Sequence, residues 1–301
     1  MKKILETIND YGKMVKFSHT LFALPFAGLA TILALIQTPH SGNELIKRLI
    51  LILICMVSAR NAAMGFNRSI DSDIDAKNPR TAVREIPSGK LSKKAVNAFT
   101  IIFSLIFIVS TYFINNLAFY LSLPALAIVL FYSYTKRFTW LCHYILGFGI
   151  GIAPTGAWIA INDSFSLIPV LWSLGLMFHI AGFDILYSTQ DAEFDKANGL
   201  HSIPSRFGIK TALWIARFNH IISFALLFSG GYMAGLGLYY FIFLILTAGL
   251  FIAEHILVSP QDLSKIHIAF FHINASISIV IFVGILLDKW SELVIAVGDK
   301  F

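Results

Sequence analysis

The sequence predicts an all-α integral membrane protein with nine transmembrane helices. Of its 301 residues, 57% are hydrophobic and only 13% are charged, which is about half the charged fraction of a soluble domain. The apolar residues occur in long blocks, and a helix needs roughly 20 such residues to cross the hydrocarbon core. Because lipid offers no hydrogen-bond partners to the backbone, each block is expected to be a helix.

Nine apolar blocks follow one another along the chain. They cover residues 17–37, 49–66, 95–115, 117–134, 140–161, 166–183, 211–234, 236–258 and 266–287. A charged amphipathic segment, residues 1–16, precedes them. The first block is long and lacks a clear small-x-small site, so we do not interpret it as a cleaved signal peptide. The breaks at 67–94 and 184–210 are long and charged, whereas most of the others are short.

The basic residues predict the orientation. With the N-terminus in the cytoplasm, 17 of the 23 Lys and Arg residues lie on the cytoplasmic side and 4 on the opposite side. This asymmetry favours a multi-pass protein of the bacterial cytoplasmic (inner) membrane whose long charged loops face the cytoplasm. The net charge of +6 is therefore explained by topology, and we expect no nucleic-acid partner. We expect residues 1–301 to form one domain.

A weak internal repeat suggests two similar halves. One Asp-x-x-x-Asp pair is Asp71/Asp75 and the other is Asp191/Asp195. Each pair is followed by Ile-Pro-Ser, at 86–88 and 203–205, and then by a glycine and a new helix. Two such halves would place both acidic pairs at the same membrane face.

The acidic residues have helical spacing. Asn67, Asp71 and Asp75 are four residues apart and would form one stripe of a helix. A second predicted stripe consists of Asp184, Tyr187, Asp191 and Asp195. Like charges four residues apart repel each other unless a cation neutralises them, and carboxylate and amide oxygens suit Mg²⁺. Solvated loop charges would explain one such motif, but they explain two matching motifs poorly. The candidate Mg²⁺ ligands are thus Asn67, Asp71, Asp75, Asp191 and Asp195.

Basic side chains accompany the two acidic motifs and are suited to phosphate. They are Arg60, Arg68, Arg80, Arg84, Lys136, Arg137 and Arg206. Arg60 lies inside an apolar block, seven residues before Asn67, and an intramembrane arginine is a functional candidate by default. His19, near the start of the first block, is more often a packing residue than a binding residue at such a position.

Three segments resemble the UbiA superfamily of intramembrane aromatic prenyltransferases. The first is Arg60 followed by Asn-Arg-Ser-Ile-Asp-Ser-Asp-Ile-Asp at 67–75, with Arg80, Thr81 and Arg84 after it. The second is Tyr-Ser-Tyr-Thr-Lys-Arg-Phe-Thr at 132–139, and the third is Asp-Ile-Leu-Tyr-Ser-Thr-Gln-Asp-Ala-Glu-Phe-Asp at 184–195. The resemblance extends over all nine predicted helices.

The resemblance implies a helical bundle around one central cavity, with the two acidic motifs facing each other at its cytoplasmic end. It implies Mg²⁺-dependent transfer of a polyprenyl chain from a polyprenyl diphosphate to a ring carbon of an aromatic acid. The catalytic residues would be Asp71, Asp75, Asp191 and Asp195. Diphosphate would be bound by Arg68, Arg84, Lys136 and Arg137. The aromatic acceptor would be bound by Arg60, His19, Tyr187 and Asp184.

One departure from the family pattern bears on the acceptor. The family motif usually begins Asn-Asp, and Arg68 stands in place of that Asp. This variant resembles the branch that prenylates 1,4-dihydroxy-6-naphthoate for menaquinone by the futalosine route. The alternative acceptor is 4-hydroxybenzoate, as in ubiquinone synthesis.

Other functions remain open from the sequence alone. A secondary transporter would place its carboxylates near the bilayer midplane, whereas these lie at predicted helix ends beside basic residues. An assembly protein would not need two metal-like motifs, and a haem or chlorin prenyltransferase is a further alternative.

Overall fold

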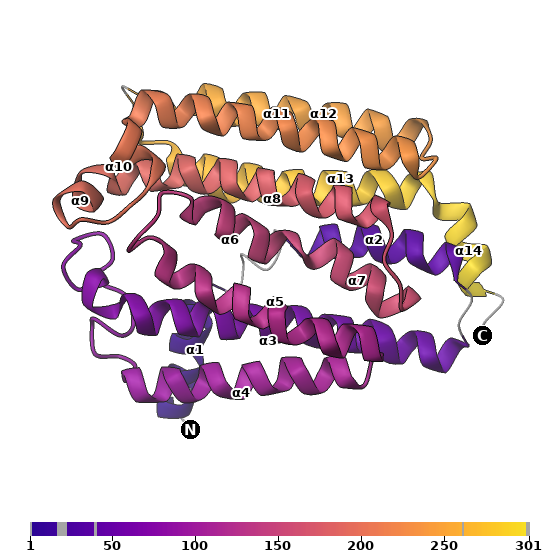
Figure 1. The fold of residues 1–301 in the computed structure, drawn as a ribbon, viewed down its shortest axis with the longest axis horizontal. Coiled ribbons are helices and arrows are strands. Elements are labelled where there is room, and N and C mark those ends of the chain that lie inside the picture. The colour runs from indigo at the N-terminus through magenta and orange to yellow at the C-terminus, as the bar shows by residue number, and fades with distance from the viewer. Residues whose placement is uncertain (1, 17–22, 39–40, 261, 299–301) are drawn as a thin grey trace. The chain divides into compact units, whose positions relative to one another are not determined.

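The computed structural model describes residues 2–16, 23–38, 41–260 and 262–298 (Figure 1). Within these ranges the protein is helical, apart from a single β-bridge between Ser259 and Asp262. The α-helices are α1 Lys2–Val15, α2 Leu24–Gln37, α3 Gly42–Asp75, α4 Lys93–Tyr112, α5 Asn116–Thr135, α6 Cys142–Gly151, α7 Ala153–Asn162, α8 Leu167–Ser188, α9 Ala192–Ala197, α10 Ile203–Phe207, α11 Ile209–Met233, α12 Leu238–Leu257, α13 Asn274–Asp288 and α14 Trp290–Gly298. A 3₁₀ turn, η2, covers Thr189–Asp191, and a π-helix, η3, covers Ile268–Ile273.

The helices confirm a multi-pass membrane protein. Eight helical segments in the described part of the chain are long and apolar enough to cross a bilayer, and α2, with 14 residues, is a shorter apolar helix. The first predicted block, 17–37, therefore appears as a helix from Leu24 onward, with Pro25 in its first turn, where a missing amide hydrogen costs nothing. Residues 17–22 lie outside the described ranges. The orientation stays a prediction.

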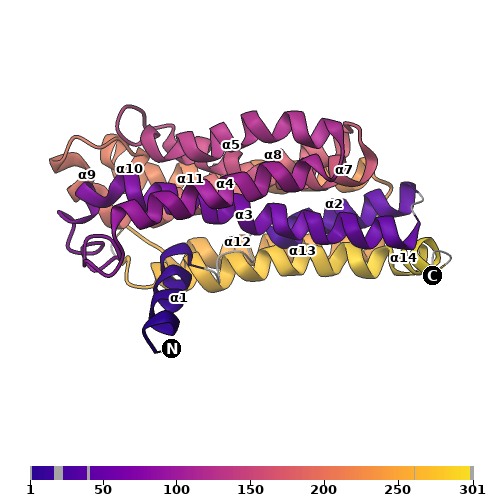
Figure 2. The same cartoon turned by 90° about the horizontal axis from the view of Figure 1, so that it is seen from below.

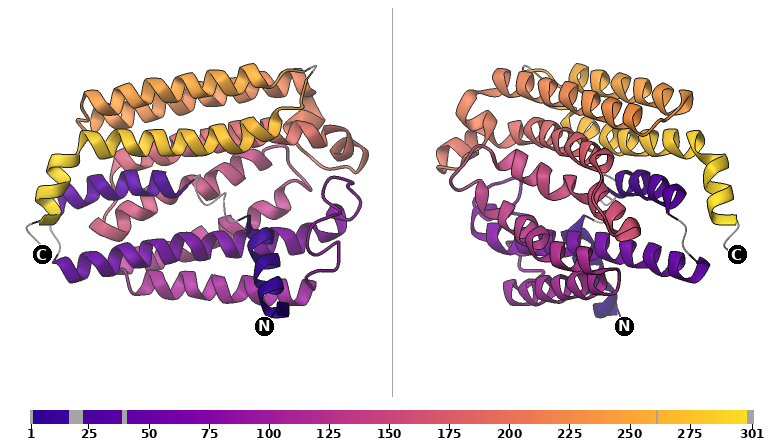
Figure 3. Two further views of the ribbon diagram at one scale, coloured as in Figure 1. Left: turned by 180° about the vertical axis from the view of Figure 1, so that it is seen from behind. Right: turned by 45° about the vertical axis from the view of Figure 1, so that its right-hand side comes forward.

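The chain divides into two compact units. Unit 1 comprises Met1–Thr20 and Leu51–Tyr134, so it holds α1, most of α3, α4 and α5. Helix α1 runs across the direction of α4 (Figures 2 and 3). Buried Met14 and Val15 of α1 pack with Leu91 and Val96, and this contact fixes the end of α1 beside the loop that follows the first acidic motif.

Unit 2 comprises Leu21–Ile50 and Thr135–Phe301. Helices α11 and α12 lie side by side, and α14 bends away from the end of α13 (Figures 1 and 3). A buried cluster that includes Ile185, Ile203, Ala212 and Ala216 joins α8, α10 and α11. This cluster packs together the helices that flank the second acidic motif.

Helices α6 and α8 approach each other closely. A Cβ on Gly147 of α6 would lie 2.5 Å from the backbone oxygen of Met177 in α8. Small residues that let backbones approach are typical of helix contacts in membranes. The contact holds the start of α6, and with it His143, against α8.

Two sequence-based boundaries are corrected. Helix α3 continues through residue 75, beyond the apolar block 49–66, so Asn67, Asp71 and Asp75 lie on the helix that their spacing predicted and the loop begins only at Ala76. The block 140–161 forms two helices rather than one. They meet at Ile152, because Pro154 has no amide hydrogen to continue the ladder of α6.

Candidate active site

The first acidic motif is one face of the last turns of α3, as predicted. The side-chain amide nitrogen of Asn67 donates a hydrogen bond of 2.8 Å to Oδ2 of Asp71. This contact requires the two side chains to lie one above the other on the helix. Both are partly exposed, whereas Asp75, one turn further on, is 5% exposed.

Asp75 is neutralised by Arg84. Nη1 of Arg84 lies 2.7 Å from each carboxylate oxygen of Asp75. The loop after α3 folds back onto the end of the helix, because the Thr81 hydroxyl donates to the backbone oxygen of Asp75 at 3.1 Å. This places Arg84, three residues later, beside Asp75. A charge-assisted contact of this length compensates a carboxylate that burial would otherwise disfavour.

Two further arginines of unit 1 lie on α3. Arg68 is 6% exposed, and its guanidinium reaches the Asn67 side-chain oxygen at 3.4 Å. Arg60 donates to the backbone oxygens of Val15 and Lys16, at 3.4 and 3.3 Å. It therefore binds the carbonyl end of α1, where a cation is favourable. The prediction that Arg60 binds the acceptor stays a prediction.

Lys16 is a candidate that the sequence reasoning missed. It directly follows α1 and has the left-handed conformation, with φ 47°. Burial lowers its pKa to about 8, and repulsion from Arg68, Arg84 and Arg80 acts in the same direction. Lys16 therefore lies in a region of positive charge, and such a region attracts anions.

The second acidic motif does not form the single helical stripe that was predicted. Helix α8 ends at Ser188, and Asp191 lies in the 3₁₀ turn η2. Ser188 and Thr189 donate their hydroxyls to the backbone oxygens of Ile185 and Leu186, at 2.9 and 2.7 Å. Such local bonds compete with the helical ladder, which explains why the α-helical register is lost before Asp191.

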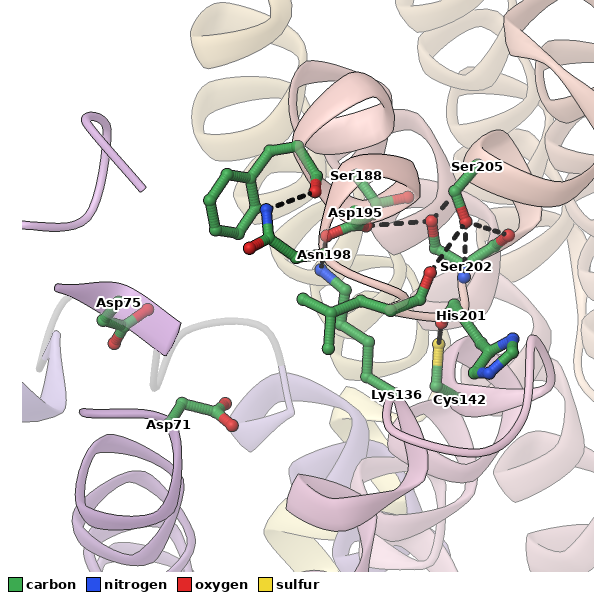
Figure 4. Close-up of polar contacts among 12 residues, drawn as sticks. Asp71, Asp75, Lys136, Cys142, Ser188, Asp195, Asn198, His201, Ser202 and Ser205 are labelled. Atoms are coloured by element: carbon green, nitrogen blue, oxygen red, sulfur yellow. Dashed lines mark hydrogen bonds and ion pairs between the residues drawn. The ribbon is translucent and has the colours of Figure 1, made fainter. Parts of the chain in front are cut away.

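Asp195 on α9 is completely buried and has two partners (Figure 4). Nζ of Lys136 lies 2.8 Å from its Oδ1, and the Ser202 hydroxyl donates to its Oδ2 at 2.9 Å. Burial disfavours the charged Lys136, but the attraction of Asp195 outweighs it, and the pKa of Lys136 lies above its ordinary value. Lys136, predicted to bind diphosphate, is thus held by an acidic residue in this structure.

Asp184 on α8 has a histidine partner. Nδ1 of His143 lies 2.6 Å from Oδ2 of Asp184, whose side chain is 25% exposed. Tyr187, one turn on, is partly buried, with its ring 6.4 Å from that of His267. Neither His143 nor Ser202 was a predicted site residue. Ser202 could have been found, because a serine before Ile-Pro is a typical helix N-cap.

The remaining predicted site residues are Asp191, Arg137 and His19. Asp191 is buried and Arg137 is partly buried in the turn after α5. His19 lies outside the described residues. Within the described residues, no group of three or more His, Cys, Asp and Glu side chains gathers closely enough to hold a metal ion.

The carboxylates nonetheless fit Mg²⁺ by their donor chemistry. This ion commonly takes only one or two carboxylates and fills its remaining positions with water and substrate phosphates. Asn67 and Asp71 already present an amide and a carboxylate on one helix face, 2.8 Å apart. The first motif by itself can therefore offer oxygen ligands of the kind that Mg²⁺ takes.

Comparison with known proteins yields one family. The chain is 29% identical over 235 residues to the 4-hydroxybenzoate octaprenyltransferase of Pectobacterium carotovorum, an alignment that covers 75% of this chain and 78% of the relative. It superposes on the apo structure of a UbiA homolog from Aeropyrum pernix K1 with a TM-score of 0.81 and 32% identity, over 90% of this chain and 98% of the other.

A more distant structure shares the fold. It is a UbiA homolog from Archaeoglobus fulgidus bound to DMAPP and Mg²⁺, with a TM-score of 0.61 and 20% identity, over 90% of this chain and 99% of the other. The profile of the UbiA prenyltransferase family matches residues 23–276, most of the chain. The chain is therefore a membrane enzyme that belongs to the UbiA prenyltransferase family.

Proposed function

We propose that this enzyme transfers a polyprenyl group from a polyprenyl diphosphate to a ring carbon of an aromatic acid, with Mg²⁺ as cofactor. The observation that carries the proposal is the pair of acidic motifs, each joined to a basic side chain, in a chain of the UbiA family. Family membership leaves the secondary-transporter alternative without support.

Each motif combines acids and cations in the way that diphosphate and its metal require. Asn67, Asp71 and Asp75 in one motif, with Asp191 and Asp195 in the other, would hold Mg²⁺. When bound, the ion neutralises charge on the diphosphate and so favours departure of the leaving group. The support from relatives is that the Archaeoglobus fulgidus homolog was solved with DMAPP and Mg²⁺.

The basic residues would bind the leaving diphosphate. Arg84 and Lys136 already contact the acids of the motifs, at 2.7 and 2.8 Å, so each can exchange a carboxylate for a phosphate oxygen. Arg68, Arg137 and Lys16 are the further candidates. As the allylic C–O bond breaks, its electron pair leaves with the diphosphate, and positive side chains stabilise the charge that develops there.

The remaining chemistry belongs to the acceptor. The electron-rich ring forms the new C–C bond and then loses a proton from the same carbon. We assign Asp184, Tyr187, Arg60 and His19 to the acceptor. Apolar helices around the reacting carbon would exclude the water that otherwise consumes an allylic cation.

Two acceptors are to be compared. The names of the curated relatives support 4-hydroxybenzoate, and it is the first acceptor to test. The second, 1,4-dihydroxy-6-naphthoate, is favoured by Arg68 at the position where the family usually has Asp. Its extra fused ring would bury more apolar surface, and each buried Å² contributes about 25 cal/mol to binding.

The test is incubation of the purified protein with a polyprenyl diphosphate, Mg²⁺ and a panel of aromatic acids, with products identified by mass spectrometry. The proposal expects one prenylated acid, and no product when Mg²⁺ is chelated. A competition assay with both acids at equal concentration then decides the acceptor. If no aromatic acid is prenylated, while water or a lipid alcohol accepts the chain, the proposal is wrong.

A further inference from the structure

His143 joins two parts of the second acidic region that are far apart in the sequence. It lies in the first turn of α6 and is 2% exposed. Its Nδ1 contacts Oδ2 of Asp184 on α8 at 2.6 Å, and its Nε2 contacts the backbone nitrogen of Ile203 on α10 at 3.2 Å. All three residues belong to unit 2.

The second contact determines the tautomer of His143. The backbone N–H of Ile203 can only donate, so Nε2 of His143 must accept and carries no hydrogen. The single hydrogen of the neutral ring is then on Nδ1, and it is donated to the Asp184 carboxylate. Ile203 is completely buried, so water does not replace His143 as the partner of this amide.

The position of Ile203 explains why a histidine is needed there. Ile203 is the first residue of α10, and the first amides of a helix have no partner within the helix. Ser202, immediately before it, caps α10 and also donates to Asp195 at 2.9 Å. His143 therefore links the carboxylate of Asp184 to the short helix whose cap holds Asp195.

We propose that His143 is a positioning residue for Asp184 in the acceptor half of the reaction, an inference that rests on the proposed function. Its Nδ1–H holds Oδ2 of Asp184, which fixes the rotamer of the side chain. Asp184 is a quarter exposed, so the carboxylate can accept a hydrogen bond from the ring hydroxyl of the acceptor. That bond increases the electron density of the ring that attacks the allylic carbon.

The proposal predicts which replacements work. His143→Gln supplies an amide N–H for Asp184 and an amide oxygen for Ile203, so it can keep both contacts. His143→Leu has similar bulk but keeps neither. We expect His143→Leu to lower kcat/KM for the aromatic acid by about tenfold or more, as happens when the orienting partner of a functional group is lost. The KM for the prenyl diphosphate should not change, and His143→Gln should stay within a few-fold of the unaltered enzyme.

The experiment measures both substrates' kinetic constants for the full-length protein in detergent. Its matched control is His272→Leu, the same substitution at an exposed histidine of unit 2. Asp184→Asn and the double variant His143→Leu/Asp184→Asn complete a cycle. If His143 acts through Asp184, the double variant is little worse than Asp184→Asn alone, because the two residues act as one unit.

The outcomes separate this inference from the proposed function. If the unaltered enzyme prenylates no aromatic acid, the proposed function fails. If it does so and folded His143→Leu has unchanged kcat/KM, or the two substitutions are additive, the inference about His143 is wrong. Should His143→Leu not fold, His143→Gln and His143→Met carry the comparison, since only Gln has a hydrogen to donate. Equal activity of these two variants would also overturn the inference.

Discussion

Removal of Lys136 should destabilise the protein through Asp195. The Asp195 side chain is 0% exposed, and its Oδ1 lies 2.8 Å from Nζ of Lys136. In Lys136→Met the alkyl chain is kept but the charge is lost, which leaves a buried carboxylate with Ser202 as its donor. Removing one partner of a buried pair typically costs 3–5 kcal/mol. Because the Lys136 side chain is 36% exposed, water screens the pair, and we expect about 3 kcal/mol.

The measurement is the unfolding free energy or melting temperature of the purified protein in one detergent. Asp195→Asn is the companion variant, since an amide needs no counter-charge. The double variant Lys136→Met/Asp195→Asn should be more stable than Lys136→Met alone, because the uncompensated charge is gone. Equal stability of Lys136→Met and the unaltered protein, or no recovery in the double variant, would refute the reasoning from burial and charge.

Three further predictions concern other parts of the chain. The pKa of Lys16, about 8 instead of 10.5, should rise when an anion binds. Pyrophosphate affinity should therefore fall as pH increases from about 8 towards 10.5, since binding then requires proton uptake. Measured by calorimetry, the affinity of Lys16→Met should depend less on pH over this range. An identical pH dependence in the two proteins would exclude Lys16 from the site. Gly147→Ala should destabilise the protein by about 1–3 kcal/mol, because its Cβ meets the Met177 backbone. Gly156→Ala, with nothing within 4 Å of its Cβ, is the control, and equal melting temperatures would contradict the packing argument. Cysteines placed at exposed Ser88 and Lys196, in a background without Cys55 and Cys142, should resist an impermeant reagent in intact cells; labelling from outside would reverse the orientation.

The membrane helices were predictable because their signal is local and long. A long apolar block in lipid must form a helix to satisfy its backbone, and in the part of the chain that is described the structure has helices at each predicted block. The ends were less predictable, because polar residues can extend a helix beyond the apolar block. Helix α3 runs 34 residues, through Asp75, and its last turns carry the acidic stripe that the four-residue spacing predicted.

The two acidic motifs show what spacing alone can predict. The Asn67 and Asp71 side chains meet at 2.8 Å, because four residues make about one helical turn and nothing local interrupts it. The same reasoning failed after Asp184, where Ser188 and Thr189 bond back to the helix and a 3₁₀ turn follows. Spacing is reliable only where the intervening residues favour a helix, and hydroxyl side chains at a helix end do not.

The cations that neutralise the motifs could not be predicted, because they come from different directions along the chain. Asp75 is paired with Arg84, which follows it by nine residues and is returned by a tight loop. Asp195, at the corresponding place in the second motif, is paired with Lys136, which lies well upstream, in the turn after α5. A duplication that produced both acidic motifs would have placed their basic partners on the same side. The predicted repeat would therefore cover the acids and not the cations, and each acid takes its counter-charge from the tertiary structure of its own unit. Charge neutrality of a buried carboxylate is a physical requirement, whereas the residue that satisfies it is decided by tertiary structure.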